Sequence, residues 1–448
     1  MTLRSAAGVT AAAALLGVVI ARWAFQSPAV RSVEPDVLRQ YAGVYQWAGG
    51  GLLHLQLWSE LSNHLVAFDE NGDVRALYSS DHDRFFAGPG AALATSIESR
   101  VDFQRDAKGT IISLTWQRQD RPPRVARRVD IERREDVHFS NGETRLAGTL
   151  ISPHTSGPHP AVILVHGSGP MNRESVLPFA RFLIRHGMAV LGYDKRGVGG
   201  STGDWYTSSF DDLAGDAVAA FDFLKARPDI DGSQIGLLGW SQAGWIMPLA
   251  AVRARDLAFL ISIAGAGVPG TETTIDHAQN EMAAAGMPPP LVAQVVALMK
   301  LQHRFAHSGE GWEEYIAARE PLAARMGANE TFPARPDDKS WAFIRRLYFY
   351  DPASTIGRLQ TPTLALFGEL DNNILARKNA AAWDAAFKSG VNRDYTLQIL
   401  PRANHLQFEA RLGTNAEIAS LQRFAPSYFT TVREWLAKRI RGFDVRAV

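Results

Sequence analysis

The sequence predicts an α/β protein with a doubly wound, mostly parallel sheet, a helical cap insertion and a preceding small antiparallel β-domain. Three observations predict this fold. Short β-type runs with glycine-containing turns fill residues 35–134, buried strand-like runs alternate with helical runs from residue 135 onward, and residues 268–358 are mainly helical in pattern. Alternating strands and helices indicate a parallel sheet, whereas closely spaced short strands indicate an antiparallel sheet or barrel.

Length and composition exclude several classes of protein. A chain of 448 residues is long enough for two domains, and its net charge of +1 predicts no nucleic-acid partner. The absence of cysteine excludes disulfides and a thiol nucleophile. The sequence has neither a zinc-protease HExxH pattern nor a P-loop, so we expect no cofactor and no metal.

The first 29 residues predict export from the cytoplasm. Arg4 precedes an apolar run over residues 6–20, and small residues follow near Ser27 and Ala29. This order is typical of a secretory signal, which is removed after export to the periplasm or medium. Alternatively, residues 4–25 stay attached as a signal-anchor, and any membrane association is expected only through them.

Residues 35–134 predict a small accessory β-domain without chemistry of its own. Runs such as 52–58, 74–78 and 111–117 are separated by turns that contain glycine. The charged segment 130–137 then leads to the larger domain, expected over residues 135–442.

The larger domain is expected to alternate strands and helices. Asn141-Gly142 marks a hairpin turn, and the β-branched apolar run at residues 160–166 predicts a strand buried on both faces. The expected strands that follow are 189–193, 235–238, 257–263, 363–367 and 395–400. The expected helices are 179–186, 213–225, 245–254, 376–388 and 426–441, besides those of the insertion over 268–358.

Residues 239–243, with the sequence GWSQA, predict a nucleophile at Ser241. A short strand-like run precedes this segment and an apolar helical run follows it. Strand, Gly-x-Ser-x-small turn and helix form the nucleophile elbow, in which bulky side chains two positions from the serine would collide. Gly239 and Ala243 occupy those two positions, although glycine is commoner than alanine at the second.

Two further residues are predicted to activate Ser241. Asp371 follows the strand expected at 363–367, and His405 follows the last expected strand. A serine nucleophile needs a base and a group that orients the base, here in the chain order Ser, Asp, His. Glu369 is the nearby rival for the acid, and Asp371 is preferred.

An oxyanion hole is predicted from two backbone N–H groups. The amide of Gln242 follows the nucleophile at the start of a helix, where its N–H is free to bind an anion. The second donor is expected in the loop 166–170, with the sequence HGSGP. Ser168 is the first choice for this donor and Gly169 the second.

Together these motifs resemble the α/β-hydrolases. The resemblance is to esterases related to dienelactone hydrolases, acyl-CoA thioesterases and prolyl-oligopeptidase-type peptidases. Its carriers are 166–170 with Arg173, 193–199 (YDKRGVG) with Ser201, 239–243, 368–371 (GELD) and His405. The resemblance implies a structural role for residues 194–199, without a catalytic part. Residues 35–134 also resemble a β-domain appended to serine hydrolases and β-lactamase-like proteins.

We therefore expect a serine hydrolase that cleaves a small-molecule carboxylic ester through an acyl-enzyme. A peptidase or an acyl-thioesterase with the same Ser-His-Asp triad is the first alternative. A non-catalytic binding protein on a hydrolase scaffold is the second, although such proteins usually lack a triad member. The acyl group, the alcohol and the oligomeric state stay open at this point.

Overall fold

The computed structural model describes residues 30–69, 71–118, 120–326 and 332–444. The chain divides into two compact units. The first unit extends to Val129 but excludes two short segments, Trp58–Asn63 and Glu70–Asp73, which belong to the second unit with the chain from Asp130 onward. The signal segment predicted over residues 1–29 lies outside the described residues.

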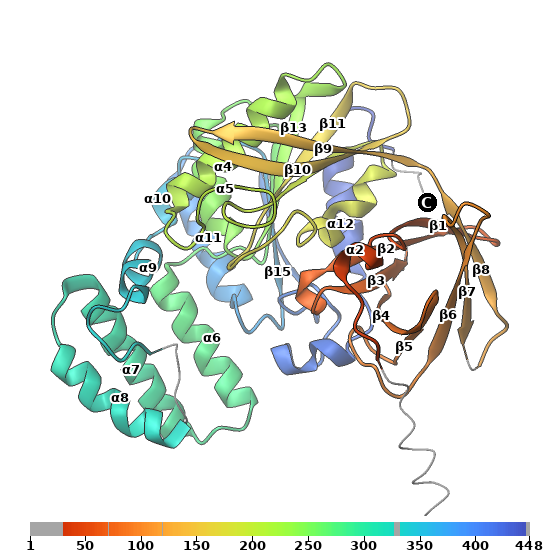
Figure 1. The fold of residues 1–448 in the computed structure, drawn as a ribbon. Helices are drawn as coiled ribbons and strands as arrows, with labels where there is room; N and C mark the ends of the chain where they lie inside the picture. Colours follow the sequence, from red (N-terminus) through yellow and green to blue (C-terminus); the bar gives the residue numbers. More distant parts are fainter. Residues whose placement is uncertain (1–29, 70, 119, 327–331, 445–448) are drawn as a thin grey trace, which may run out of the picture. The chain divides into compact units, whose positions relative to one another are not determined.

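The first unit is a closed antiparallel barrel, in which each strand is bonded to the next in sequence and the last returns to the first (Figure 1). A short helix, α2 (Pro35–Leu38), precedes it. The strands are β1 (Gly43–Trp47), β2 (Leu52–Trp58), β3 (His64–Asp69), β4 (Val74–Asp81), β5 (Arg84–Ala87), β6 (Ser99–Arg105), β7 (Ile111–Arg118) and β8 (Arg124–Val129). The prediction of a small antiparallel β-domain is thus confirmed.

The barrel closes around side chains that alternate along its strands. In β6, Val101 and Phe103 are buried while Arg100, Asp102 and Gln104 are exposed, because successive side chains of a strand point to opposite faces. The buried positions of several strands meet in one apolar core, which includes Leu55, Leu65, Val101, Leu114 and Ala126.

The second unit is built on an eight-stranded sheet with the order β16-β15-β14-β13-β11-β12-β10-β9. Its strands are β9 (Glu132–Asn141), β10 (Thr144–Pro153), β11 (His159–Val165), β12 (Ala189–Tyr193), β13 (Ile230–Trp240), β14 (Phe259–Ile263), β15 (Thr363–Gly368) and β16 (Tyr395–Leu400). Strands β9 and β10 form an antiparallel hairpin. Neighbouring strands pair in parallel along the order β12-β11-β13-β14-β15-β16. The predicted mostly parallel sheet is confirmed.

Helices that connect the strands, and one that follows the last strand, cover this sheet (Figure 1). They include α4 (Phe210–Lys225), α5 (Ala243–Arg253), α10 (Ala353–Ile356), α11 (Ala376–Ser389) and α12 (Ser427–Ala437), with the 3₁₀ turns η1 (Ser59–Leu61) and η3 (Asn415–Ser420) elsewhere in this unit. Helix α4 starts three residues before the predicted position, because Ser209 and Asp212 form a reciprocal capping box.

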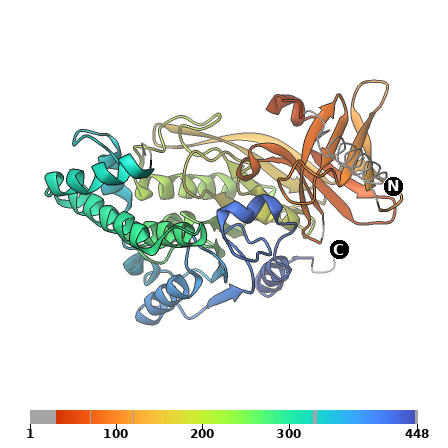
Figure 2. The same cartoon turned by 90° about the horizontal axis from the view of Figure 1, so that it is seen from below.

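Four helices between β14 and β15 form the predicted cap. They are α6 (Gly270–Ala284), α7 (Pro289–Ser308), α8 (Trp312–Met326) and α9 (Ser340–Leu347), and both views show them gathered beyond the end of the sheet (Figures 1 and 2). Their shared core includes Phe305, Tyr315 and Trp341. Lys378 of α11 joins the cap to the rest of the unit through Glu272 at 2.8 Å and Asp276 at 2.7 Å.

Two local predictions differ from the structure. The helix expected over 179–186 is replaced by a single turn, α3 (Leu177–Ala180), and a 3₁₀ turn, η2 (Arg181–Ile184). Nearly all of its side chains are buried, and the guanidinium of Arg181 is held by Glu132, so the segment has no solvent face of the kind that a surface helix needs. The charged segment at 130–137, expected to pass between the domains, is instead the start of β9.

Candidate active site

The chain makes a strained turn at Ser241 between β13 and α5. Ser241 has φ of 60°, in the left-handed region that non-glycine residues rarely adopt. Its N–H donates to the carbonyl of Ile263 at 2.9 Å. A Cβ on Gly239 would lie 2.5 Å from the Cβ of Ala243, so the turn tolerates no larger pair at these two positions. The structure therefore gives Ser241 the elbow geometry that its neighbours predict.

His405 lies within hydrogen-bonding distance of both Ser241 and Asp371. The Nε2 atom of His405 is 3.1 Å from Oγ of Ser241, and Nδ1 is 2.8 Å from Oδ2 of Asp371. An ionised carboxylate can only accept, so Nδ1 carries the hydrogen and Nε2 of the neutral ring is free to accept the serine proton. The three residues follow β13, β15 and β16, whose carboxyl ends meet at one edge because these strands are parallel.

The carboxylate of Asp371 is held in one orientation. Its Oδ1 atom accepts the backbone N–H groups of Asn373 and Ile374, each at 2.8 Å, and its side chain is fully buried. Glu369 is exposed, and its Oε2 accepts the N–H of Arg402 at 3.0 Å. Of the two candidate acids, Asp371 alone is bonded to His405 in the described part of the chain.

Aromatic side chains pack against His405. The indole Nε1–H of Trp240 donates to the carbonyl of His405 at 2.8 Å, and the two rings lie 4.9 Å apart. Trp240 stacks on Phe179, which in turn contacts Trp58. Trp245 lies elsewhere in the core, where it packs on Phe210.

The two amides predicted to bind an oxyanion are free to do so. Ser168 lies in an exposed loop after β11, and Gln242 directly precedes α5. Within the described residues, neither backbone N–H donates a hydrogen bond. The loop begins at His166, whose buried ring bonds the carbonyl of Tyr193. Burial lowers the pKa of His166 to about 3, so this ring is neutral near neutral pH.

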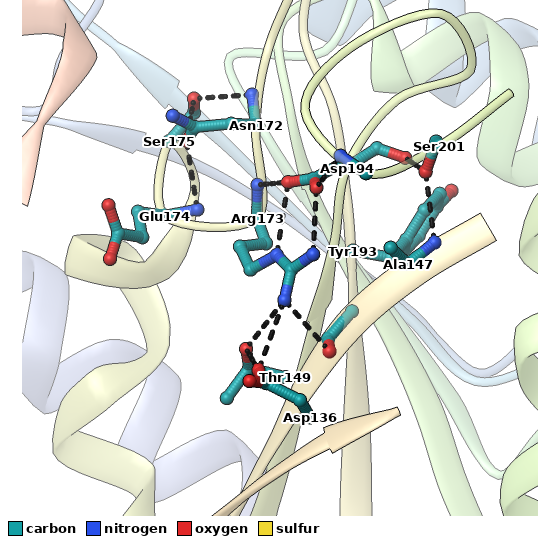
Figure 3. A network of polar contacts seen from close by, with 12 residues as sticks. Asp136, Ala147, Thr149, Asn172, Arg173, Glu174, Ser175, Tyr193, Asp194 and Ser201 are labelled. Carbon is teal, nitrogen blue, oxygen red and sulfur yellow. Dashed lines mark hydrogen bonds and ion pairs between the residues drawn. The ribbon is translucent and has the colours of Figure 1, made fainter. Parts of the chain in front are cut away.

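A polar network holds the loop that follows β12 (Figure 3). Arg173 donates through Nε and Nη2 to the two carboxylate oxygens of Asp194, at 3.1 and 2.8 Å. Burial raises the pKa of Asp194, but the bonds from Arg173 and Gly200 outweigh it and the net pKa is lowered. Ser201 donates to the carbonyl of Asp194 at 2.7 Å and accepts the N–H of Ala147 at 3.0 Å.

Sequence reasoning missed two ionisable residues near His405. Glu60 belongs to the segment Trp58–Asn63 of the second unit, and burial raises its pKa while the charge of His405 lowers it. His277 lies on cap helix α6, and burial lowers its pKa, with Glu281 raising it and His405 lowering it. No local motif marks either residue, because each lies far from His405 in the sequence and influences it only through the electrostatics of the folded chain.

The described residues contain neither a candidate metal centre nor a candidate membrane span. No group of three or more histidine or acidic side chains within them is placed to hold a metal ion. No helix within them combines the length and the apolar character that a bilayer crossing requires.

The chain is similar to several known proteins. Esterase EstD of Thermotoga maritima is 25% identical over 347 residues, covering 73% of this chain and 73% of EstD. Dipeptidyl-peptidase 5 of Porphyromonas gingivalis is 26% identical over 288 residues, covering 62% of this chain and 34% of that protein. A solved structure of a Pyrococcus furiosus esterase is 15% identical with a TM-score of 0.44, and covers 69% of this chain and 92% of that one.

The family itself is shown by a sequence profile. The profile of the alpha/beta hydrolase family matches residues 162–417, more than half of the 448 residues. The match includes the elbow, the strands that follow it, His405 and Asp371. The chain therefore belongs to the alpha/beta hydrolase family.

Proposed function

We propose that this protein is a serine carboxylesterase that works through an acyl-enzyme. The observation that carries the proposal is the relay from Oγ of Ser241 through His405 to Asp371, at 3.1 and 2.8 Å. A buried carboxylate, an imidazole of fixed tautomer and a serine raised on a strained turn are the components that make a hydroxyl nucleophilic.

Each component has a defined part in the reaction. His405 takes the proton of Ser241 as Oγ attacks the ester carbonyl, and then gives it to the departing alcohol. Asp371 keeps the imidazole in the required tautomer and stabilises its charged form. The N–H groups of Ser168 and Gln242 bind the oxyanion of the tetrahedral intermediate. Water then attacks the carbonyl of the acyl-enzyme. His405 takes a proton from this water and gives it to Oγ of Ser241 as the carboxylic acid leaves.

Similarity to EstD supports an ester as the substrate, since that relative is named an esterase. Fluorophosphonate labelling combined with a panel of p-nitrophenyl esters of increasing acyl length tests the proposal. We expect labelling at Ser241, no labelling of Ser241→Ala, and ester turnover that depends on acyl length. An unlabelled, folded wild-type protein, or equal labelling of Ser241→Ala, would contradict it.

A serine peptidase is the second candidate, because Dipeptidyl-peptidase 5 also matches this chain. The same relay serves amide and ester cleavage, so the bond must be decided by turnover. Peptide and acyl-CoA substrates assayed beside the esters distinguish the candidates. Peptide cleavage without ester preference would replace the esterase by a peptidase.

We also propose that the protein is exported by its first 29 residues. The pattern of Arg4, an apolar run and small residues near Ser27 supports this proposal. Expression with and without residues 1–29, followed by fractionation and N-terminal sequencing, tests it. Retention of the full-length protein inside the cytoplasm would contradict export.

A further inference from the structure

A buried lysine bonds the loop that holds Ser168 and the side chain of Gln242. The Nζ atom of Lys195 donates to the carbonyl of Gly167 at 2.8 Å, to that of Gly169 at 3.1 Å and to Oε1 of Gln242 at 3.1 Å. Lys195 is only 2% exposed. Its three partners thus flank Ser168 on both sides and include the side chain of the residue that supplies the other amide.

Peptide geometry links Lys195 to the direction of the Ser168 N–H. The carbonyl of Gly167 and the N–H of Ser168 belong to one planar trans peptide, in which the two groups point in opposite directions. Because the carbonyl points at Nζ, the N–H of Ser168 points away from Lys195. A cation bound to the carbonyl also polarises the peptide and makes its N–H a stronger donor.

The hydrogen bonds of Lys195 favour its charged form but leave that charge without a bonded carboxylate. Three acceptors match the three N–H donors of an ammonium group, whereas a neutral amine has only two. The neighbouring carboxylates are engaged elsewhere in the described structure, Asp194 by Arg173 at 2.8 Å and Asp216 by Arg196. Burial lowers the pKa of Lys195 to about 7, with Asp216 raising it.

Resting on the proposed function, we propose that Lys195 is a positioning residue of the oxyanion hole. Its ammonium group fixes the Gly167–Ser168 peptide and Gln242, and its charge stabilises the oxyanion that forms when Ser241 attacks. In the resting enzyme the three acceptors bonded to Lys195 are uncharged. The tetrahedral intermediate brings a negative charge to this site. Such preorganised charge acts more strongly on the transition state than on the neutral substrate.

Steady-state kinetics of Lys195→Met and Lys195→Gln test the proposal. We expect kcat for a p-nitrophenyl ester to fall about 100-fold, the scale of one lost oxyanion contact, with little change in KM. A trifluoromethyl ketone, to which Ser241 adds to form a tetrahedral oxyanion, should bind more weakly by the factor lost in kcat/KM. Unchanged kcat and unchanged ketone affinity in folded variants would overturn the proposal.

Ser201→Ala is the matched control, because Ser201 lies in the same loop and bonds Asp194 and Ala147 but not Lys195. We expect lower stability with unchanged kcat and unchanged ketone affinity. A fall in kcat equal to that of Lys195→Met would show that general loosening of the loop explains both effects, and would overturn the proposal.

A measurement on the wild-type enzyme keeps the test valid even if the lysine variants do not fold. With ¹⁵N-labelled lysine, NMR can follow the ionisation of Lys195 in the free enzyme and in the ketone adduct. A nearby negative charge favours the charged amine, so its pKa should rise in the adduct. Among the groups around Lys195, Asp194, Arg173, Asp216 and Arg196 do not change between the two states, and His166 is neutral. His405 does change, because it takes the Ser241 proton in the adduct. Its positive charge opposes the rise, so the pKa of Lys195 rises only if the oxyanion acts on the lysine more strongly than the imidazolium does. An unchanged pKa would overturn the proposal.

Fluorophosphonate labelling separates this inference from the proposed function. If wild-type Ser241 is not labelled, the serine esterase mechanism fails and the role of Lys195 fails with it. If Ser241 is labelled but the lysine variants retain full activity, only the role of Lys195 is overturned.

Discussion

Asp371 binds His405 through one carboxylate oxygen, at 2.8 Å, while two backbone N–H groups occupy its other oxygen. The two backbone bonds fix the carboxylate in an orientation in which its second oxygen accepts from the imidazole. Glu369, only two residues earlier, bonds the backbone of Arg402 instead. The difference between the two acids is therefore a matter of direction rather than of chemical type.

The first prediction concerns Asp371→Asn. We expect kcat to fall about 10,000-fold, because an amide in place of the carboxylate stabilises the wrong imidazole tautomer. Glu369→Gln is the matched control and should retain wild-type kcat. Ester turnover of the two purified variants measures both effects. A larger loss of kcat in Glu369→Gln than in Asp371→Asn would show that Glu369, and not Asp371, orients His405.

The second prediction concerns the support that Trp240 gives to His405. Trp240→Phe keeps an aromatic ring but removes the N–H that donates to the His405 carbonyl at 2.8 Å. We expect kcat to fall by up to about 100-fold, the scale of a misplaced catalytic group. Trp245→Phe also removes an indole bond, to the carbonyl of Val268 at 3.0 Å, away from the relay.

Both tryptophan variants should lose about 1–3 kcal/mol of stability, since each leaves a buried carbonyl without its donor. Only Trp240→Phe should change kcat. Denaturant unfolding beside ester turnover separates the two quantities, and an equal loss of kcat in both variants would refute a specific role for Trp240.

The third prediction concerns the space inside the elbow. In Gly239→Ala the new methyl would lie 2.5 Å from the Cβ of Ala243 and 3.0 Å from the carbonyl oxygen of Val165. We expect the turn to shift and activity to be lost. Ala243→Gly alone should stay active, at a cost of about 1 kcal/mol for glycine in a helix.

Combining the two changes should restore part of the activity, because it removes one of the close contacts but not that with Val165. Ester turnover and thermal unfolding of the single and double variants provide the measurement. Full activity of Gly239→Ala would mean that the elbow has more room than the structure indicates.

The fourth prediction concerns the pH dependence that Asp194 contributes to stability. Its pKa is lowered in the folded protein, mainly because the bonds from Arg173 outweigh the effect of burial. The stabilisation is therefore present above the unfolded pKa of about 3.9 and is lost as the pH falls through the lower, folded value. Asp194→Asn should flatten this part of the acid unfolding curve.

At neutral pH, Asp194→Asn should also lower the free energy of unfolding by about 3–5 kcal/mol, because it leaves the guanidinium of Arg173 without its buried partner. Asp136→Asn is the matched control, since Asp136 bonds the same arginine at 3.2 Å but its side chain is 80% exposed (Figure 3). It should change stability by less than about 1 kcal/mol. Equal losses in both variants, measured by urea unfolding, would contradict the role of burial.

Much of the fold was predictable because burial periodicity is local. The apolar run at 160–166 corresponds to β11, and the run at 395–400 has the bounds of β16. Segments that depart from simple periodicity were harder to interpret. Most residues of η2 are buried, so the segment lacks the exposed face of a surface helix. At the start of β9, the acidic side chains form ion pairs with arginines distant in the sequence, Arg181 and Arg227.

The elbow around Ser241 can be read from local sequence, because the need for small residues at 239 and 243 is a steric property of a five-residue turn. The sequence also placed Asp371 and His405 after parallel strands, whose ends share one edge of a sheet. The packing of the folded chain is needed to show that Asp371 rather than Glu369 bonds His405, and that Lys195 bonds the Gly167 carbonyl and the side chain of Gln242. These contacts join segments far apart in the chain, and their directions depend on the packing of whole strands and loops.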